Sequence, residues 1–149
     1  MSKKILFLTG TRADFGKIKS LIQILEAHPE FEPFIFVTGM HLQKEYGYTL
    51  LEVERCGFTN IHTFENHIHE TTMDLTLAKT IKGLSAYVKQ CEPDMIVIHG
   101  DRVEALAGAI VGSLNNILVS HIEGGEVSGT IDELIRHSTS KMSHVHFVS

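Results

Sequence analysis

Cysteine is scarce in this sequence, because Cys56 and Cys91 are the only two among 149 residues. They lie far apart, and neither belongs to a Cys-x-x-Cys pair. A zinc site built on thiolates and a disulfide framework are therefore not indicated. Since unpaired cysteines are typical of a reducing compartment, we expect a cytoplasmic protein.

Long apolar runs and an excess of basic residues are also missing. The apolar core of the N-terminus, residues 5–8, is too short for a signal peptide or a membrane span. The formal net charge of -5 argues against nucleic acid as a general partner. With 43 % hydrophobic and 21 % charged residues and no linker or repeat, the chain is expected to form one globular domain that binds neither nucleic acid nor a membrane.

Two common nucleotide-binding motifs are absent as well. A P-loop has four residues between its glycines, but five separate Gly10 from Gly16, and Ile18 follows Lys17. The dinucleotide pattern G-x-G-x-x-G does not occur. What remains is a glycine turn with Arg12 and Lys17 near a helix N-terminus, where the helix dipole favours anions. Arg12 can bind a phosphate bidentately, and the alternative is a solvated turn with two surface cations.

Short apolar runs alternate with helical patterns along the chain. The apolar runs, expected as strands, span 4–9, 32–39, 60–64, 94–100, 116–122 and 144–149. Apolar residues at helical spacing predict helices over 14–27, 43–55, 72–90, 103–114 and 132–142. This alternation is typical of an α/β fold with a Rossmann-like, mostly parallel sheet and helices on both faces. Ligands of such sheets bind beyond the carboxyl ends of the strands, so residues there are the candidates for a site.

Carboxylates follow two successive strands and open the next helix. Asp101 and Glu123 each come after an expected strand, and Asp132 begins a helix. Asp101 can instead cap the following helix, and Glu123 can be a surface acid. Thr130 and Glu133 can form a capping box, and an acid in a first helical turn also serves the helix dipole. Grouped acids can have their pKa values pushed apart, so the cluster predicts proton transfer.

The ten histidines raise the question of a metal site. His67 and His69 alternate, as do His144 and His146, so each pair can share a strand face. No third and fourth ligand follow at zinc-like spacing, and we expect no metal. His99, at the end of a buried strand, is expected to support its neighbours rather than to bind a metal.

The whole chain resembles a known family. The segments that carry the resemblance read TGTRADFGKIKSLI, HGDRVEA and SHIEGGEVSGTIDELIRHSTSKMSHVHFVS, in this order. They are similar to the N-terminal half of UDP-N-acetylglucosamine 2-epimerases. The wording GDRxE, HIEGGE and IDELIRH is closer to the hydrolysing branch of that family than to its reversible branch.

This resemblance implies a two-domain fold of the glycosyltransferase-B type. Residues 1–149 would form its Rossmann-like N-terminal domain, and the second, nucleotide-binding domain would lie outside this chain. The implied substrate is a UDP-sugar held between the domains, and the complete protein is expected to be a homodimer or homotetramer. The family reaction eliminates UDP to give a 2-acetamidoglycal, and the hydrolysing branch then adds water to give N-acetylmannosamine for sialic-acid-type sugar synthesis. Neither a cofactor nor a metal is implied.

The resemblance also assigns residues to these steps. The catalytic acids of the family correspond to Asp101, Glu123 and Asp132. They would share removal of the C2 proton, help to the leaving group, and delivery of a proton or water. The residues expected to bind the substrate are Arg12, Lys17 and Arg136, with Arg12 at the phosphates and Arg136 able to orient the acids.

Several alternatives stay open. The substrate could be a UDP-2,4-diacetamido-6-deoxy sugar, or the enzyme could be the reversible epimerase. A nucleotide-sugar-binding module without chemistry would explain Arg12 but leave the acids unused, and a glycosyltransferase would explain only the architecture. The segments 41–47 and 66–74, which follow expected strands, are the candidates for sugar selection.

Overall fold

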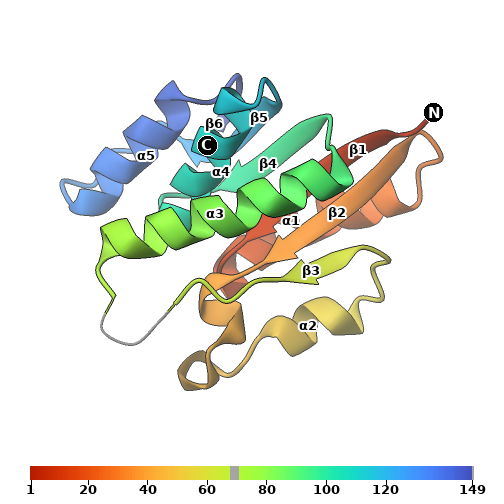
Figure 1. The fold of residues 1–149 in the computed structure, drawn as a ribbon, viewed down its shortest axis with the longest axis horizontal. Helices are drawn as coiled ribbons and strands as arrows, with labels where there is room; N and C mark the ends of the chain where they lie inside the picture. The colour runs from red at the N-terminus through yellow and green to blue at the C-terminus, as the bar shows by residue number, and fades with distance from the viewer. Residues whose placement is uncertain (68–70, 149) are drawn as a thin grey trace.

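A parallel sheet forms the centre of the computed structural model, which describes residues 1–67 and 71–148 (Figure 1). The strands are β1 (Lys3–Thr9), β2 (Phe31–Val37), β3 (Ile61–Thr63), β4 (Met95–His99), β5 (Leu118–Gly124) and β6 (Val145–Val148). All neighbouring strands pair in parallel, in the order β3-β2-β1-β4-β5-β6. The strands predicted from the apolar runs are confirmed, with ends shifted by a few residues.

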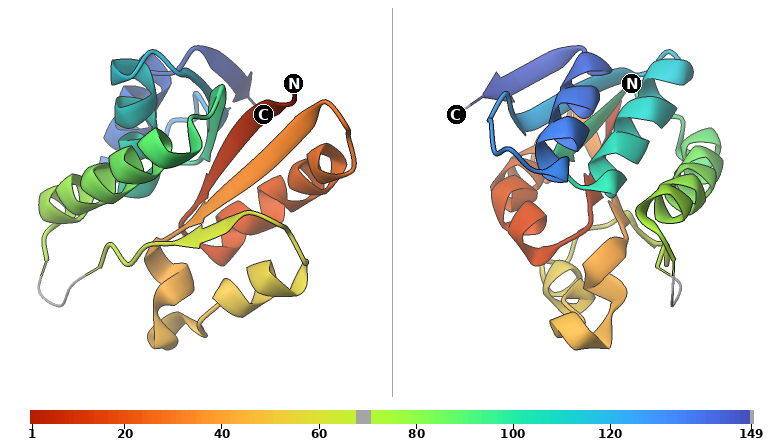
Figure 2. Two further views of the ribbon diagram at one scale, coloured as in Figure 1. Left: turned by 45° about the vertical axis from the view of Figure 1, so that its right-hand side comes forward. Right: turned by 90° about the vertical axis from the view of Figure 1, so that its left-hand side faces the viewer.

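Helices cover both faces of this sheet (Figure 2). They are α1 (Arg12–Glu26), α2 (Leu50–Arg55), α3 (Met73–Cys91), α4 (Val103–Leu114) and α5 (Ile131–Lys141). α1 and α2 pack on one face, whereas α3 and α4 lie side by side on the other, with α5 next to α4. The predicted Rossmann-like architecture is thereby confirmed. None of the helices in the described ranges is long and apolar enough to cross a membrane.

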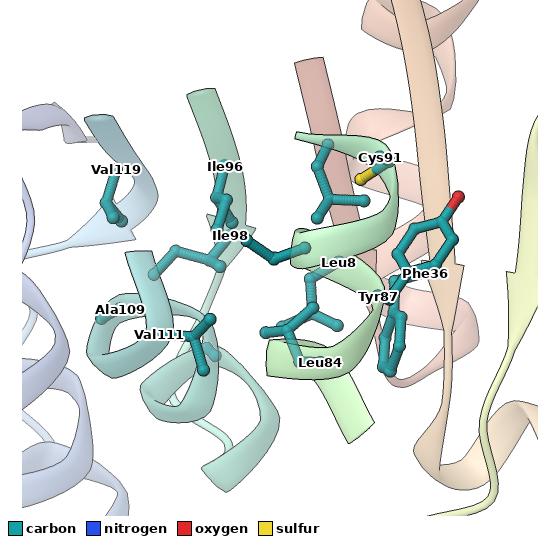
Figure 3. Packing of buried hydrophobic residues seen from close by; sticks show 13 residues of the cluster. Leu8, Phe36, Leu84, Tyr87, Cys91, Ile96, Ile98, Ala109, Val111 and Val119 are labelled. Atoms are coloured by element: carbon teal, nitrogen blue, oxygen red, sulfur yellow. The ribbon is translucent and has the colours of Figure 1, made fainter. Parts of the chain in front are cut away.

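Two apolar clusters, one on each face, hold the helices to the sheet. Successive residues of a strand point to opposite faces, so Leu6 and Leu8 of β1 join the cluster under α3 and α4. Ile5 and Phe7 of the same strand join the cluster under α1. Figure 3 shows the first cluster, where side chains of β1 and β4 meet those of α3 and α4. Both faces are buried, which is why the central strands read as continuous apolar runs.

Small residues allow α4 to lie close to the sheet. A β-carbon on Gly108 would come within 2.5 Å of Ile98, and one on Gly112 within 2.4 Å of Val119. Packed side chains do not tolerate such distances, so only glycine permits this approach of helix to sheet. The small-residue pattern of this helix is therefore explained by packing within the domain.

The helix predicted over 43–55 is wrong in its first half. Within this range the structure has one 3₁₀ turn, η2 (Lys44–Tyr46), before the short α2, and a second turn, η1 (Gly39–Leu42), precedes the range. Gly47 has a φ of 81°, which ends a right-handed helix. The buried His41 fixes this loop, because its ring hydrogen-bonds to one threonine on β1 and to another just before α2. The loop consequently lies beside the carboxyl ends of the strands.

Candidate active site

The carboxyl ends of β1, β4 and β5 surround a cavity of about 410 Å³. β1 and β4 are neighbours, yet the helices that follow them, α1 and α4, cover opposite faces of the sheet. Loops diverge at such a switch point and leave a crevice for ligands. We call this space the switch-point cavity. Its lining residues are Thr11, Ala13, Asp14, Met40, His99, Gly100, Asp101, Arg102, Glu123, Glu126 and Arg136.

Asp101 is held in the switch-point cavity by a buried arginine. Arg136, on α5, is 5 % exposed and donates from Nη2 to Oδ2 of Asp101. Its Nη1 donates to the carbonyl of Glu126 at 2.8 Å. Asp101 does not cap α4, because the N-cap position falls on Arg102 and carries no side-chain cap bond. The capping alternative for Asp101 is therefore wrong, and its carboxylate is placed by a residue of another element.

Glu123 leaves the end of β5 in an unusual backbone conformation. Its φ of 61° lies in the left-handed region, and the pairing of β5 with β6 is irregular between Ile122 and Gly124. Oε1 lies 3.2 Å from Nζ of Lys17, and Oε2 lies 3.0 Å from Nε2 of His99. Burial alone would raise the pKa of Glu123, but the Lys17 hydrogen bond and the charges of His99 and Lys17 outweigh it and lower the pKa. This carboxylate is therefore ionised at neutral pH.

His99, the last residue of β4, connects two carboxylates. Its Nδ1 lies 2.9 Å from Oδ1 of Asp14. Burial alone would lower the pKa of His99, but the bond to Asp14 and the charges of Asp14 and Glu123 outweigh it and raise the pKa. Oδ2 of Asp14 accepts from the backbone N–H of Gly10 at 3.2 Å and of Thr11 at 3.1 Å. The sequence predicted a supporting role for His99 but missed Asp14, although Thr11 and Asp14 have the spacing of a capping box, and that box forms.

A fully buried histidine, His121, holds the turn between β4 and α4. Its Nε2 lies 2.7 Å from the carbonyl of Gly100, and its Nδ1 lies 2.9 Å from Oγ of Ser140. A carbonyl can only accept, so Nε2 carries the proton and the hydroxyl of Ser140 donates to Nδ1. Burial lowers the pKa of His121, which keeps the ring neutral. Gly100 adopts a φ of 82° and turns the chain sharply before Asp101.

Asp132 lines a second cavity of about 320 Å³ rather than the switch-point cavity. Met40 and Arg102 line both cavities, so the two spaces adjoin. The predicted acid cluster is therefore divided, with Asp101 and Glu123 on one side of this boundary and Asp132 on the other. Parts of the segments predicted to select the sugar also line the second cavity, whereas residues 68–70 lie outside the described part of the chain.

The capping box predicted between Thr130 and Glu133 at the start of α5 does not form. Thr130 occupies the N-cap, but its side chain makes no cap bond. Glu133 accepts from the backbone N–H of Gly129 and from that of Ser128 at 3.1 Å. Glu133 therefore orders the turn before α5, and Asp132 is left as the acid of this helix that faces a cavity.

The two cations of the first loop have different surroundings. The Arg12 side chain is 75 % exposed, pairs with Glu52 at 3.1 Å, and lines neither of the two cavities. Lys17 instead points to the site, since its Nζ pairs with Glu123. The structure thus brings Lys17, but not Arg12, to the predicted acids.

Sequence reasoning missed a buried polar group next to Asp132. Glu104 is 5 % exposed, and its Oε1 accepts from Asn66 at 3.3 Å. Its Oε2 lies 3.5 Å from Nε of Arg102, which stands at the boundary of the two cavities. The motif HGDRVEA contains Arg102 and Glu104, so their position after a strand was the available signal. Sequence reasoning included Asn66 only as the first residue of the segment 66–74, and its side chain also accepts from the N–H of Gly39 at 3.0 Å.

The histidine pairs considered as metal ligands are not gathered into a site. Within residues 1–67 and 71–148, no group of three or more His, Cys, Asp or Glu side chains is arranged to hold a metal ion. His69 lies outside the described residues, so the structure does not describe its position relative to His67. His144 is occupied otherwise, because its Nδ1 accepts from the N–H of Val119 at 3.0 Å.

The sheet topology and the position of the site at its switch point together indicate the class of the protein. The chain is a Rossmann-like domain of the glycosyltransferase-B type, with two of the three predicted acids, Asp101 and Glu123, at the switch point of its sheet. The family model described as UDP-N-acetylglucosamine 2-epimerase matches residues 23–149. The chain therefore belongs to the UDP-N-acetylglucosamine 2-epimerase family.

Similarity to individual proteins is consistent with membership of this family. A UDP-N-acetylglucosamine 2-epimerase of Neisseria meningitidis serogroup B is 53 % identical, over 99 % of this chain and 39 % of that protein. The UDP-N,N'-diacetylbacillosamine 2-epimerase (hydrolyzing) of Legionella pneumophila is 38 % identical, over 100 % of this chain and 40 % of that protein. The crystal structure of a UDP-GlcNAc 2-epimerase from Neisseria meningitidis bound to UDP-GlcNAc has the same fold, with a TM-score of 0.84 and 22 % identity over 97 % of this chain and 39 % of that one. The chain thus spans 39 % to 40 % of the length of these relatives.

Proposed function

We propose that the complete gene product is a hydrolysing UDP-N-acetylglucosamine 2-epimerase, with residues 1–149 as its N-terminal domain and a second nucleotide-binding domain outside them. The observation that carries this proposal is that Asp101 and Glu123 face one cavity at the switch point of a member of this family. The motif wording supports the hydrolysing reaction, as does likeness to the Legionella protein, whose name states hydrolysis.

The first half-reaction breaks two bonds of the substrate. A base removes the C2 proton, the electron pair forms a C1=C2 double bond, and UDP departs with the electrons of the C1–O bond. Glu123 is our candidate for the base, because its lowered pKa keeps it ionised. Asp101, oriented by Arg136, is our candidate for assistance to the leaving group.

The second half-reaction adds water to the glycal. The hydroxyl goes to C1, and a proton goes to C2 on the face that gives the manno configuration. Asp132, in the adjoining cavity, is our candidate for delivering the proton or the water. General acid–base help of this kind contributes about 10²–10⁴ in rate for each group.

The substrate would be held by its diphosphate. Lys17 is close to Glu123, and Arg12 would have to leave Glu52 to reach a phosphate. Arg136 is buried and would act through Asp101 rather than by direct contact. The UDP-GlcNAc in the Neisseria crystal structure supports a UDP-sugar as the ligand class.

A UDP-2,4-diacetamido-6-deoxy sugar is the second candidate substrate, and the name of the Legionella relative favours it. We also propose a cytoplasmic location, which the free thiols Cys56 and Cys91 support. A homodimer or homotetramer is proposed for the complete protein, and light scattering after gel filtration tests it.

Phosphorus NMR of the complete gene product with each UDP-sugar in turn tests the activity. Release of free UDP from UDP-N-acetylglucosamine is expected. Release of UDP only from the diacetamido sugar would make that sugar the substrate instead. Interconversion of UDP-sugars without net release of UDP would show the reversible reaction. No turnover of any UDP-sugar would contradict the proposal.

The acids are tested by isosteric substitution in the same protein. We expect Asp101→Asn, Glu123→Gln and Asp132→Asn each to lower kcat by about 10²–10⁴ while circular dichroism stays unchanged. Glu30→Gln makes the same chemical change on an exposed residue just before β2, at the amino-terminal end of the strands and away from the site, and should keep full activity. Unchanged turnover in all three acid variants would refute their assignment.

A further inference from the structure

The backbone of Glu123 requires an explanation beyond its charge. A residue with a β-carbon is rarely stable at a φ of 61°, and such conformations persist only where surrounding contacts impose them. The carboxylate is two-thirds buried and contacts two groups, Lys17 through Oε1 and His99 through Oε2. The Lys17 side chain is 61 % exposed and flexible, whereas that of His99 is 8 % exposed. The rigid contact of Glu123 is therefore the one with His99.

The orientation of the His99 ring is fixed from its other side. Oδ2 of Asp14 is occupied by two backbone N–H groups, which leaves Oδ1 for the ring. An ionised carboxylate can only accept, so Nδ1 of His99 carries a proton. Nε2 then faces Glu123 and has no aligned hydrogen bond with any residue in the described ranges, although Oε2 of Glu123 lies only 3.0 Å away. The ring thus stands between two carboxylates at ion-pair distance.

We propose that Asp14 and His99 are positioning residues for Glu123. Asp14 fixes the orientation of the His99 ring through the proton on Nδ1. The ring in turn holds the Glu123 side chain, whose backbone is left-handed, in place to accept the C2 proton. The proposal rests on the epimerase function proposed above. It assigns two residues that neither the acid cluster nor the cap of α1 by itself would identify as parts of the site.

Charged groups from several elements surround this arrangement and set its response to pH. Asp14 and Lys17 come from α1, and Glu123 and the neutral His121 come from β5. Asp101 adjoins from the loop after β4, with its charge balanced by Arg136 of α5. When the His99 ring is protonated on both nitrogens it is, besides Lys17, a cation at ion-pair distance from Glu123, so loss of this charge makes Glu123 harder to ionise.

The test uses the complete gene product with His99→Gln and Asp14→Asn. His99→Gln should lower kcat by about 10²-fold with KM within about threefold, because orientation and not binding is lost. Asparagine at position 14 can still accept from both backbone N–H groups, but its amide nitrogen faces Nδ1 and prevents protonation of the ring. Asp14→Asn should therefore lower kcat by about tenfold while α1 remains capped.

The pH profile separates positioning from a merely structural role. Glu123 acts as a base, so the acidic limb of kcat/KM should move to higher pH in both variants. His28→Gln changes an exposed histidine between α1 and β2, at the amino-terminal end of the strands, and should leave the acidic limb of kcat/KM in place. A His99→Gln variant with folded circular dichroism, normal kcat and an unmoved limb would overturn the proposal. His99→Asn provides a second replacement if the glutamine variant does not fold.

A measurement without substrate distinguishes failure of this inference from failure of the proposed function. In the complete protein labelled with ¹⁵N-histidine, the His99 ring should stay protonated to higher pH than an ordinary histidine, whose pKa is about 6.5. Asp14→Asn and Glu123→Gln should each lower its titration midpoint. If no UDP-sugar is turned over, the proposed function fails, while unchanged midpoints in both variants would reject the positioning role on their own.

Discussion

The side chain of Arg136 is difficult to replace, even by lysine. Its guanidinium is 6 % exposed and serves two acceptors, Asp101 and the carbonyl of Glu126, from two different nitrogens. Lysine has a single compact ammonium and cannot reproduce this planar arrangement. We expect Arg136→Lys to lower kcat at least about tenfold and to reduce the free energy of unfolding by about 1–3 kcal/mol, since one part-buried acceptor loses its hydrogen bond from the buried guanidinium. UDP release and urea unfolding measure the two effects.

Arg55→Lys is the matched control for this substitution. Arg55 is exposed in the last turn of α2, and its replacement should change the free energy of unfolding by less than about 0.5 kcal/mol. If the two variants behaved alike, the buried pair with Asp101 would have no special importance.

At the scale of residues, the sequence indicates two acids that line the switch-point cavity but not which side chains they contact. Asp101 and Glu123 could be located because each follows an apolar run, and the ends of parallel strands meet. The partner of Asp101 lies 35 positions away on α5, so the pair depends on where that helix packs. Arg12 was expected at the phosphates, but its pairing with Glu52 depends on the position of α2, which sequence spacing does not determine.

At the scale of elements, the packing of α4 against the sheet leads to a prediction about glycine. A methyl group on Gly108 would meet Ile98 at 2.5 Å and Leu8 at 3.0 Å. Either the helix or these core side chains would have to move. We therefore expect Gly108→Ala to lower the free energy of unfolding by about 1–3 kcal/mol, despite the better helix propensity of alanine. Urea unfolding of the complete protein, followed by far-UV circular dichroism, measures this change.

Gly16→Ala is the control within the same fold. Gly16 lies in α1 and is exposed, and a β-carbon at this position would have no heavy atom within 4 Å. This substitution should stabilise the protein by about 0.5–1 kcal/mol, because alanine favours the helix and restricts the unfolded chain. Equal effects of the two substitutions would mean that α4 can withdraw from the sheet without loss.

The elements that could be predicted are those whose own sequence determines them. The helices over 72–90 and 103–114 were located well because their apolar residues repeat at helical spacing. The error over 43–55 arose because this segment is folded by contacts from outside it. Buried His41 bonds to Thr9 on β1, and Gly47 interrupts the helix, so tertiary contacts decide the conformation.

At the scale of the whole molecule, stability should fall as the solution becomes acidic. Burial lowers the pKa of His41, His62 and His121. Below about pH 6.5 the unfolded chain therefore takes up protons that these rings refuse in the folded protein, which favours unfolding. His99 acts in the opposite sense, because its raised pKa gives a contribution that is complete below about pH 6.5 and is lost as pH rises through the folded value.

Three rings against one predict a net loss of stability in acid. The melting temperature should decrease between about pH 7.5 and about pH 5.5, and His41→Gln should make this decrease smaller because one such ring is removed. Differential scanning calorimetry of both proteins compares the slopes rather than the absolute values. An identical slope in the variant would exclude His41 as a source of the dependence.

The overall architecture could be predicted, but the order of the strands could not. Alternating strands and helices indicate a parallel sheet with two covered faces. Whether β4 adds next to β3 or returns to β1 depends on which edge offers the better apolar surface, and spacing along the chain carries no such information. The return to β1, seen in the pairing of Ile5 with Met95, is what creates the switch point and brings Asp14 to His99.

The two cations near the first loop, Arg12 and Lys17, form ion pairs that differ in exposure to water, and this difference implies an order in which they bind a ligand. The side chain of Arg12 is 75 % exposed and that of Glu52 is 44 % exposed, so water screens their pair and it contributes little. Lys17 is also exposed, but its partner Glu123 is two-thirds buried, so this pair is better shielded from water than the Arg12 pair. On the proposed function, we expect the diphosphate of the ligand to bind first to the more exposed Arg12 and then to Lys17. The diphosphate would then draw Lys17 away from Glu123, while the contact with His99 keeps this carboxylate in place for the sugar.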